Sequence, residues 1–245
     1  MLFLALIFGL IIGSFLNVII YRLPLNLQGK NYSIISPSRS ICPNCQVPLG
    51  FWQLLPLLSF IIQKGKCKSC KAKISWQYPI IELISAVISV LIIARFGIGF
   101  EAFFYLLFGY ISITLFIIDF KHQLLPDVLT LGLLWLGLLF HLEDFAALSQ
   151  GIIGAVAGYL SLWSIHWIFK LLTGKAGFGY GDFKLTAALG VWLGWEILPL
   201  LISLSAAAAL IFALFKGIKI GQVFAFGPFL LIIGNFLLFI NKIAL

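Results

Sequence analysis

Apolar runs of close to 20 residues recur along the whole chain, and this feature limits the fold more than any other. The runs cover residues 2–20, 79–96, 100–118, 128–142, 150–170, 184–195, 197–215 and 223–241. A helix of about 20 apolar residues spans a bilayer, and lipid admits only helices and closed barrels as spanning structures. The composition agrees, because the chain is 62% hydrophobic and 10% charged. The sequence therefore predicts an all-α polytopic membrane protein with about eight transmembrane helices, the fourth and sixth being short.

The distribution of charge orients these predicted spans. The first run begins at Leu2 with no basic residue before it, whereas a signal peptide carries positive charge ahead of its apolar core. We therefore expect a retained first span with its N-terminus outside. Residues 21–78 then lie in the cytoplasm, and they carry eight of the sixteen Lys and Arg residues and no Asp or Glu. The other basic residues on inner loops are Lys121, Lys170, Lys175, Lys184, Lys216 and Lys219.

This topology accounts for the net charge of the chain. Only Arg95 and Lys242 are left outside, as the preference of cytoplasmic loops for positive residues requires. The formal net charge of +8 therefore needs no nucleic-acid partner. The sequence predicts three parts: a first transmembrane helix over residues 1–21, a cytoplasmic cysteine-rich domain over 22–78, and a membrane-embedded domain over 79–245.

All four cysteines lie within residues 42–70, as the motifs CPNC and CKSC. Two C-x-x-C pairs separated by 21 residues are typical of a zinc ribbon whose metal is held by four thiolates. A reducing cytoplasm favours metal binding over disulfides. Four thiolates close the coordination sphere, so the zinc on Cys42, Cys45, Cys67 and Cys70 is predicted to be structural. The alternative is two reactive redox pairs.

Lysines surround the second cysteine pair. They are Lys64, Lys66, Lys68, Lys71 and Lys73. Such a cluster next to a membrane span is typical of contact with anionic lipid headgroups. A groove for a substrate is the alternative interpretation.

Three aspartates are predicted to lie at the cytoplasmic ends of spans. Asp119 ends the third run, Asp127 follows Pro126 at the start of the fourth, and Asp182 follows the glycines of GFGYGD. An ionisable group at that depth is costly, so its default interpretation is functional. Two carboxylates that share a site hold one proton between them, so that one activates water while the other protonates a leaving amine. This is the chemistry of aspartic peptide hydrolysis.

The surroundings of these aspartates help to choose between them. Asp127 is interpreted as a residue that starts a helix, and Asp182 alone would also fit a helix cap. Asp119 lies at the C-terminal end of a helix, where the dipole disfavours a negative charge. Gly179 and Gly181 remove Cβ atoms, so that another helix or an extended peptide can approach the backbone, although Gly-x-Gly alone also fits a flexible linker. Asp119 and Asp182 are therefore the predicted catalytic pair.

One further carboxylate falls inside a predicted span. Glu82 lies close to the start of the second span, where its charge is tolerated near a helix N-terminus. An intramembrane Glu is equally a candidate site residue. The chain contains neither a Ser-His-Asp set nor an H-E-x-x-H motif, so serine peptidase and zinc metallopeptidase mechanisms have no support.

Five segments together resemble the type IV prepilin peptidases, which are membrane aspartic proteases of the GxGD class. The segments are GSFLNVIIYRLP, the paired C-x-x-C motifs, WQYPIIEL, IDFKHQLLPD and GYGDFKLTAALGVWLGW. The resemblance covers nearly the whole length and places the family's catalytic aspartates on Asp119 and Asp182. It implies cleavage of the basic leader of type IV prepilins and type II secretion pseudopilins at the cytoplasmic face of the bacterial inner membrane.

The resemblance also implies a second reaction, N-methylation of the new N-terminal residue with S-adenosylmethionine. The family associates this reaction with the cysteine-bearing segment. The family carries an Asn-Ile-Pro-like stretch where this chain reads Leu54-Leu55-Pro56. That departure concerns methyl transfer and leaves the peptidase segments untouched. No glycine-rich Rossmann turn is present, so a methyl-donor site would be of another kind, and its residues are not indicated.

Two other function classes compete with a peptidase. A small transporter could use Asp119 and Asp182 as coupling carboxylates, but its carboxylates are expected near the bilayer midplane, among repeats and broken helices. A structural membrane scaffold would need neither aspartate. The position of both aspartates at the inner boundary favours the peptidase.

Overall fold

The computed structural model describes residues 1–29, 39–174, 177, 179–217 and 224–243, and helices dominate this part of the chain. Five helices are long and apolar enough to cross a membrane: α1 (Leu2–Leu27), α3 (Gln77–Phe96), α4 (Phe100–His122), α6 (Phe145–Thr173) and α8 (Leu198–Lys216) with the turn before it. Two shorter apolar helices are α5 (Asp127–Phe140) and α9 (Gly227–Ile243). The described residues contain no β-strand, so the predicted all-α membrane class is confirmed.

The ends of the helices differ from the predicted runs in informative ways. Helix α4 continues to His122, so Asp119 lies inside its last turn rather than at its end. Helix α6 begins earlier than predicted because Asp144 caps it, accepting hydrogen bonds from the N–H groups of Ala146 and Ala147 at 2.9 and 3.1 Å. Gly194, with a φ of +80°, ends a helix close to the break predicted between the runs 184–195 and 197–215. Some positions named in the sequence predictions lie outside the described residues: Lys30, Lys175, Phe178, Lys219 and residue 223, the start of the last predicted run.

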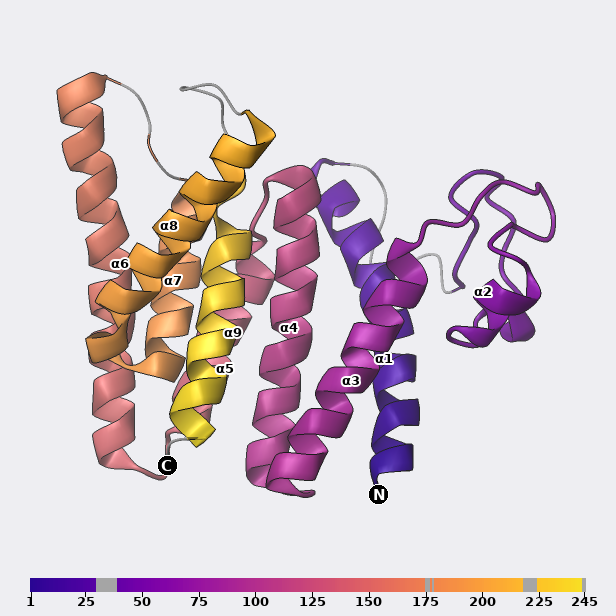
Figure 1. The fold of residues 1–245 in the computed structure, drawn as a ribbon, viewed down its shortest axis with the longest axis horizontal. Helices are drawn as coiled ribbons and strands as arrows, with labels where there is room; N and C mark the ends of the chain where they lie inside the picture. The colour runs from indigo at the N-terminus through magenta and orange to yellow at the C-terminus, as the bar shows by residue number, and fades with distance from the viewer. Residues whose placement is uncertain (30–38, 175–176, 178, 218–223, 244–245) are drawn as a thin grey trace. The chain divides into compact units, whose positions relative to one another are not determined.

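The chain forms two compact units, Met1–Thr114 and Leu115–Leu245. In the first unit α1 and α3 lie side by side (Figure 1) and pack through small residues. A Cβ atom on Gly13 would lie 2.6 Å from the Cα of Glu82, so only glycine permits this approach. Close packing of this kind is the usual way in which helices associate in lipid. The predicted three-part division concerns membrane topology, and it stays a prediction.

Helix α7 (Tyr180–Leu193) is the core helix of the second unit. It packs against α5, α6 and α9, and nearly every residue from Asp182 to Leu193 is buried. The backbones of Gly154 in α6 and Gly190 in α7 meet directly. The indole N–H of Trp192 donates to the carbonyl of Leu133 in α5 at 3.0 Å. Protein rather than lipid therefore covers α7.

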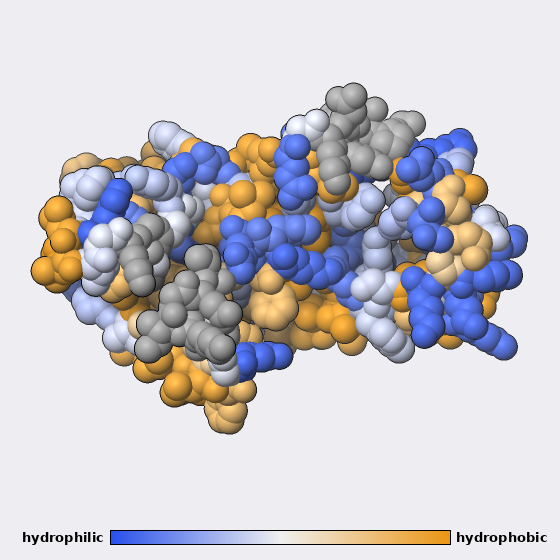
Figure 2. Space-filling view, turned by 90° about the horizontal axis from the view of Figure 1, so that it is seen from above, coloured by the Kyte–Doolittle hydropathy of each residue, from blue (hydrophilic) through white to orange (hydrophobic). Residues whose placement is uncertain are grey.

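The cysteine segment of the first unit consists mainly of loops, with a 3-10 turn (Phe51–Gln53) and the short helix α2 (Leu58–Ile62). The surface over this segment, at the right of Figure 2, mixes hydrophilic and apolar residues. The five lysines around the second cysteine pair are all exposed. Phe51 and Trp52 are also exposed, at 74% and 77%. A surface that joins cations to aromatic rings is typical of a membrane–water boundary.

Candidate active site and metal centre

Asp182 lies in the first turn of α7 and is 8% exposed. Gly179 has an extended backbone and precedes the helix, and its N–H donates to Oδ2 of Asp182 at 3.1 Å. The carboxylate therefore caps its own helix, as one sequence interpretation held, and the positive end of the helix dipole stabilises its charge. The cap occupies one lone pair and leaves the remaining ones of the carboxylate for other partners.

Asp119 lies in the last turn of α4 and is 4% exposed. The backbone N–H of Gly227, the first residue of α9, hydrogen-bonds its carboxylate. The positive end of α9 thus offsets the unfavourable dipole of α4. Oδ2 of Asp119 is buried and has no hydrogen-bond partner among the described residues. A buried carboxylate oxygen without a partner is rare and points to a chemical role.

The two aspartates belong to one site of the second unit. Their carboxyl groups interact electrostatically. Leu125 packs between the backbone of Gly181, next to Asp182, and the backbone of Gly227, which bonds Asp119. A Cβ atom added to Gly181 would lie 2.8 Å from Cβ of Leu125, and a Cβ atom added to Gly227 would lie 3.2 Å from Cδ1 of Leu125. A Cβ on Gly227 would also lie 2.5 Å from Oδ2 of Asp119. The structure therefore brings together two acids that are far apart in the sequence.

The glycines near the acids have separate roles. Gly181 is needed for close packing, whereas a Cβ on Gly179 would meet only Oδ2 of Asp182, at 3.5 Å. Gly227 was missed by the sequence analysis. A signal was available, because Gly227-Pro228 precedes an apolar run and proline favours the first turn of a helix. Its contact with Asp119 depends on the tertiary fold and leaves no local pattern.

Asp127 is not part of this pair. It is the first residue of α5, as predicted, and makes no side-chain cap. Both of its carboxylate oxygens accept hydrogen bonds from Nζ of Lys184 at 2.7 Å. The side chain of Asp127 is 58% exposed, so this is a surface ion pair between α5 and α7.

The four cysteines form one cluster in the first unit. Their Sγ atoms all lie within 4.8 Å of one another, and all four thiols are free. The two loops share one hydrogen-bond pattern: the N–H of Cys42 donates to Val47 and that of Cys67 donates to Ala72, at 3.0 and 2.9 Å. Sulfurs around a tetrahedral zinc lie about 3.8 Å apart for a Zn–S bond of about 2.3 Å. The cluster could therefore hold a metal ion, and its arrangement does not divide into two separate redox pairs.

Two thiols of the cluster, Cys45 and Cys70, differ in acidity. The N–H of Ala72 and the amide of Asn44 lower the pKa of Cys70 to about 6. The pKa of Cys45 is raised to about 11: the N–H of Val47 lowers it, but desolvation and the neighbouring thiols together raise it more. Thiolates at this spacing repel one another, and a divalent cation removes that repulsion. The donor set is the one that zinc prefers.

Glu82 is buried in the first unit and joins three segments. Oε2 accepts a hydrogen bond from the N–H of Leu57 at 2.8 Å, and the carboxylate also bonds to the side chain of Ser14 in α1. Leu57 has a φ of +57° and a ψ of −49°. It is the centre of a strained γ-turn, in which the N–H of Leu58 donates to the carbonyl of Pro56 at 2.6 Å. Backbone strain of this kind persists where the surroundings hold it, often at functional sites.

Two family models match the chain. Residues 7–96 match the Bacterial Peptidase A24 N-terminal domain, and residues 106–214 match the Type IV leader peptidase family. The first match contains the four cysteines and Glu82, and the second contains Asp119 and Asp182. No solved structure matches the chain.

Full-length relatives extend these matches. The chain is 43% identical to the prepilin leader peptidase/N-methyltransferase of Aeromonas salmonicida, over 93% of this chain and 87% of that protein. It is 43% identical to the protein of the same name from Neisseria gonorrhoeae, over 94% and 87%. It is 44% identical to the one from Pseudomonas aeruginosa, over 92% and 86%.

Proposed function

The chain belongs to the type IV leader peptidase family, and from this premise we propose that it removes the leader of prepilins and methylates the new N-terminus. The assignment of the peptidase chemistry to Asp119 and Asp182 is supported by one observation above all. Two buried carboxyl groups from separate helices interact within one site, and one carboxylate oxygen has no partner among the described residues. Family membership also argues against the transporter and the scaffold considered from the sequence.

We propose that the two aspartates work as an acid–base pair. One carboxylate accepts a proton from water as the water oxygen attacks the scissile carbonyl carbon. The other, protonated, gives its proton to the leaving nitrogen as the C–N bond breaks. The N–H of Gly179 and the N–H of Gly227 hold the carboxylates in place and leave their other lone pairs for water and substrate.

We place this reaction at the cytoplasmic face of the bacterial inner membrane. The relatives act on prepilins by name, and type II secretion pseudopilins are the further substrates that we expect. The proposed orientation has the N-terminus outside and the cysteine segment in the cytoplasm, in line with the three-part division of the chain. The exposed lysines of that segment then face anionic lipid headgroups, and nucleic acid has no role.

The second reaction needs a methyl donor, which we propose to be S-adenosylmethionine. Its sulfonium group supplies an electrophilic methyl carbon. The new N-terminal amine forms an N–C bond to that carbon, the C–S bond breaks, and the amine gives up a proton. We assign the four thiolates of Cys42, Cys45, Cys67 and Cys70 to a structural zinc ion, because their number and spacing suit a closed tetrahedral site.

The peptidase assignment is tested with membranes that carry Asp119→Asn or Asp182→Asn. Asparagine nearly keeps the shape but cannot carry the proton, and acid–base catalysis is worth about 10²–10⁴-fold. Each variant should therefore cleave a prepilin at least about 100-fold more slowly. Asp144→Asn is the matched control, because Asn also caps a helix and Asp144 lies at the start of α6. Normal cleavage by either variant of the pair would remove that residue from the site.

A further inference from the structure

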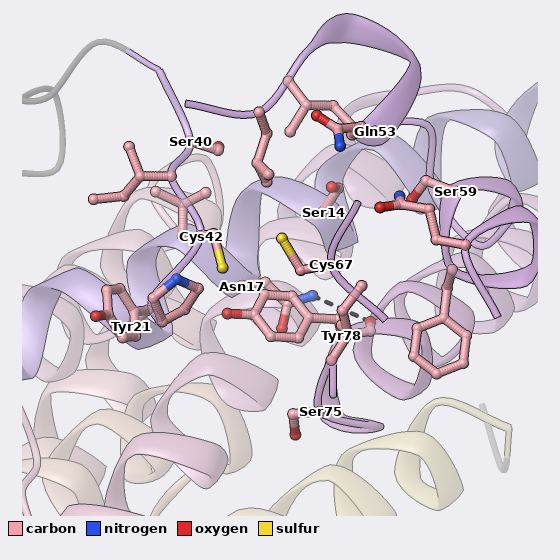
Figure 3. A pocket seen from close by; sticks show the side chains of 18 of the residues that line it. Ser14, Asn17, Tyr21, Ser40, Cys42, Gln53, Ser59, Cys67, Ser75 and Tyr78 are labelled. Carbon is pink, nitrogen blue, oxygen red and sulfur yellow. Dashed lines mark hydrogen bonds between the residues drawn. The ribbon is translucent and has the colours of Figure 1, made fainter. Parts of the chain in front are cut away.

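The short helix α2 is turned the opposite way to a helix on a surface that water covers. Ser59 in α2 and Gln63 at its end line a cavity of about 370 Å³, which α1, the start of α3 and the cysteine segment surround (Figure 3). The apolar residues Leu58, Ile61 and Ile62 face outward and are 56%, 68% and 74% exposed. A helix in water shows the reverse pattern, with its apolar residues toward the protein. A surrounding medium that is itself apolar explains the pattern of α2.

We propose that α2 lies in the membrane, with Leu58, Ile61 and Ile62 against the acyl chains of the leaflet next to the cysteine segment. The partner of this surface is therefore the bilayer itself. The inference goes beyond the proposed function, which brings only the lysines of the segment to the lipid headgroups. It does not depend on methyl transfer or on leader cleavage.

The depth of α2 follows from its contacts with two membrane helices. The N–H of Leu57, just before α2, donates to Oε2 of Glu82 in α3 at 2.8 Å, and the same carboxylate bonds the side chain of Ser14 in α1. Ser14 lies six residues inside the end of the apolar run 2–20, and Glu82 lies three residues inside the start of the run 79–96. At a rise of about 1.5 Å per residue, α2 therefore begins about 5–9 Å inside the apolar layer. Helices that lie in the interface of a bilayer reach about 5–10 Å into it.

The other end of α2 returns to the membrane boundary. The ring of Phe60 packs on that of Trp76, the residue before α3, with the ring centroids 4.9 Å apart. Trp76 is exposed, and tryptophans at the ends of membrane helices are typical of the headgroup level. Lys64 and Lys66 follow α2 and are exposed, as suits residues that meet lipid phosphates. Apolar side chains, an aromatic ring and lysines thus succeed one another in the order of the layers of a membrane.

The strained turn before α2 also meets the requirements of this depth. In lipid every backbone polar group needs a partner within the protein. The N–H of Leu58 donates to the carbonyl of Pro56 at 2.6 Å, and the N–H of Leu57 donates to Glu82. Glu82 therefore has a use that its position in the sequence left open. Its carboxylate accepts from a backbone donor of the turn and holds the start of α2 at the level of the membrane helices.

The test places a tryptophan on this surface of the full-length chain, in vesicles of phosphatidylglycerol and phosphatidylcholine. The emission that Ile62→Trp adds to the wild type is measured with two quenchers, bromine on the lipid acyl chains and acrylamide in the water. Ile11→Trp on the exposed face of α1 is the reference for lipid, and Glu143→Trp in the exposed loop before α6 is the reference for water. We expect brominated lipid to remove most of the added emission of Ile62→Trp, as for Ile11→Trp, and acrylamide to remove little of it.

A second variant, Ile61→Trp, repeats the measurement at a neighbouring exposed position. Unchanged zinc content and prepilin cleavage show that each variant is folded. The proposal requires quenching by lipid at both positions. Quenching by acrylamide instead would overturn it, because the surface would then lie in water. Protection from both quenchers would also overturn it, because a second copy of the chain or another protein would then cover the surface. Either contrary result leaves the proposed peptidase and methyl-transfer assignments untouched.

Discussion

The pair of aspartates, Asp119 and Asp182, is held in place by other means than a cavity of about 370 Å³ that α1, the start of α3 and the cysteine segment line in the first unit. Asp119 and Asp182 lie on helices α4 and α7, and the N–H groups of two helix starts, at Gly179 and Gly227, fix their carboxylates. The cavity has membrane helices on one side only, and loops held by the cysteine cluster form the other. The first site is defined by close backbone packing, and the second by hydrogen bonds to a strained turn and by a metal-binding cluster.

This difference predicts where each region is sensitive. The acid pair should respond to the loss of a proton carrier or to one added methyl group, because helix packing leaves it no room to adjust. The cavity should respond to loss of metal, because loops without zinc have little apolar core of their own. The two reactions should therefore be separable by substitution.

Removal of zinc should have the largest effect, and it should act on the cavity. A four-thiolate site is worth on the order of 10–16 kcal/mol of binding free energy, which becomes folding free energy of the cysteine segment. We expect about one zinc per chain by metal analysis, and methyl transfer should fall more than leader cleavage when the metal is stripped with a chelator. A protein without zinc, or one with two disulfides, would contradict the metal assignment.

Asp119→Asn should have the next largest effect, and it should act on the acid pair alone. Cleavage falls by about 10²–10⁴-fold because one proton carrier is lost. Methylation of a substrate that has already been cleaved should continue, because the family associates methyl transfer with the cysteine-bearing segment of the first unit, whereas Asp119 belongs to the second unit. The measurement is transfer of labelled methyl groups to mature pilin by the variant. Loss of both activities in a well-folded variant would contradict separate sites.

Gly227→Ala should have an intermediate effect. The added methyl group would lie 2.5 Å from Oδ2 of Asp119 and must displace the carboxylate. Overpacking costs about 1–3 kcal/mol, so cleavage should fall about 5- to 100-fold. Gly132→Ala in α5 is the control, since a Cβ there meets no atom within 4 Å. Equal cleavage rates for these two variants would show that Gly227 does not support the acid pair.

Asp127→Asn should have the smallest effect. The variant weakens an exposed ion pair with Lys184, and such pairs are worth about 0.2–1 kcal/mol. Prepilin cleavage should stay within about 5-fold of the wild type. If Asp127→Asn stops cleavage while Asp119→Asn does not, the first catalytic carboxylate lies at the head of α5 and the pair has been assigned wrongly.

Local sequence patterns were sufficient to predict the helices and the cysteine cluster, but they did not predict the contacts between distant segments. Apolar length indicated the helices, and cysteine spacing predicted a cluster that the structure then brought together. The contacts of Gly227 with Asp119 and of Leu57 with Glu82 could not be foreseen, because each joins segments that are distant in the chain. The extension of α4 beyond Asp119 was also missed, since polar residues in a last helical turn look like a loop.

The central claim is that Asp119 and Asp182 act as one catalytic unit, and a double-mutant cycle on prepilin cleavage tests it most directly. The rates of Asp119→Asn, Asp182→Asn and the double variant are compared with that of the wild type. Members of one catalytic unit are not additive, so each single variant should lose about 10²–10⁴-fold and the double variant should be scarcely slower. Single losses that multiply in the double variant would show that the two carboxylates act independently and would contradict the account.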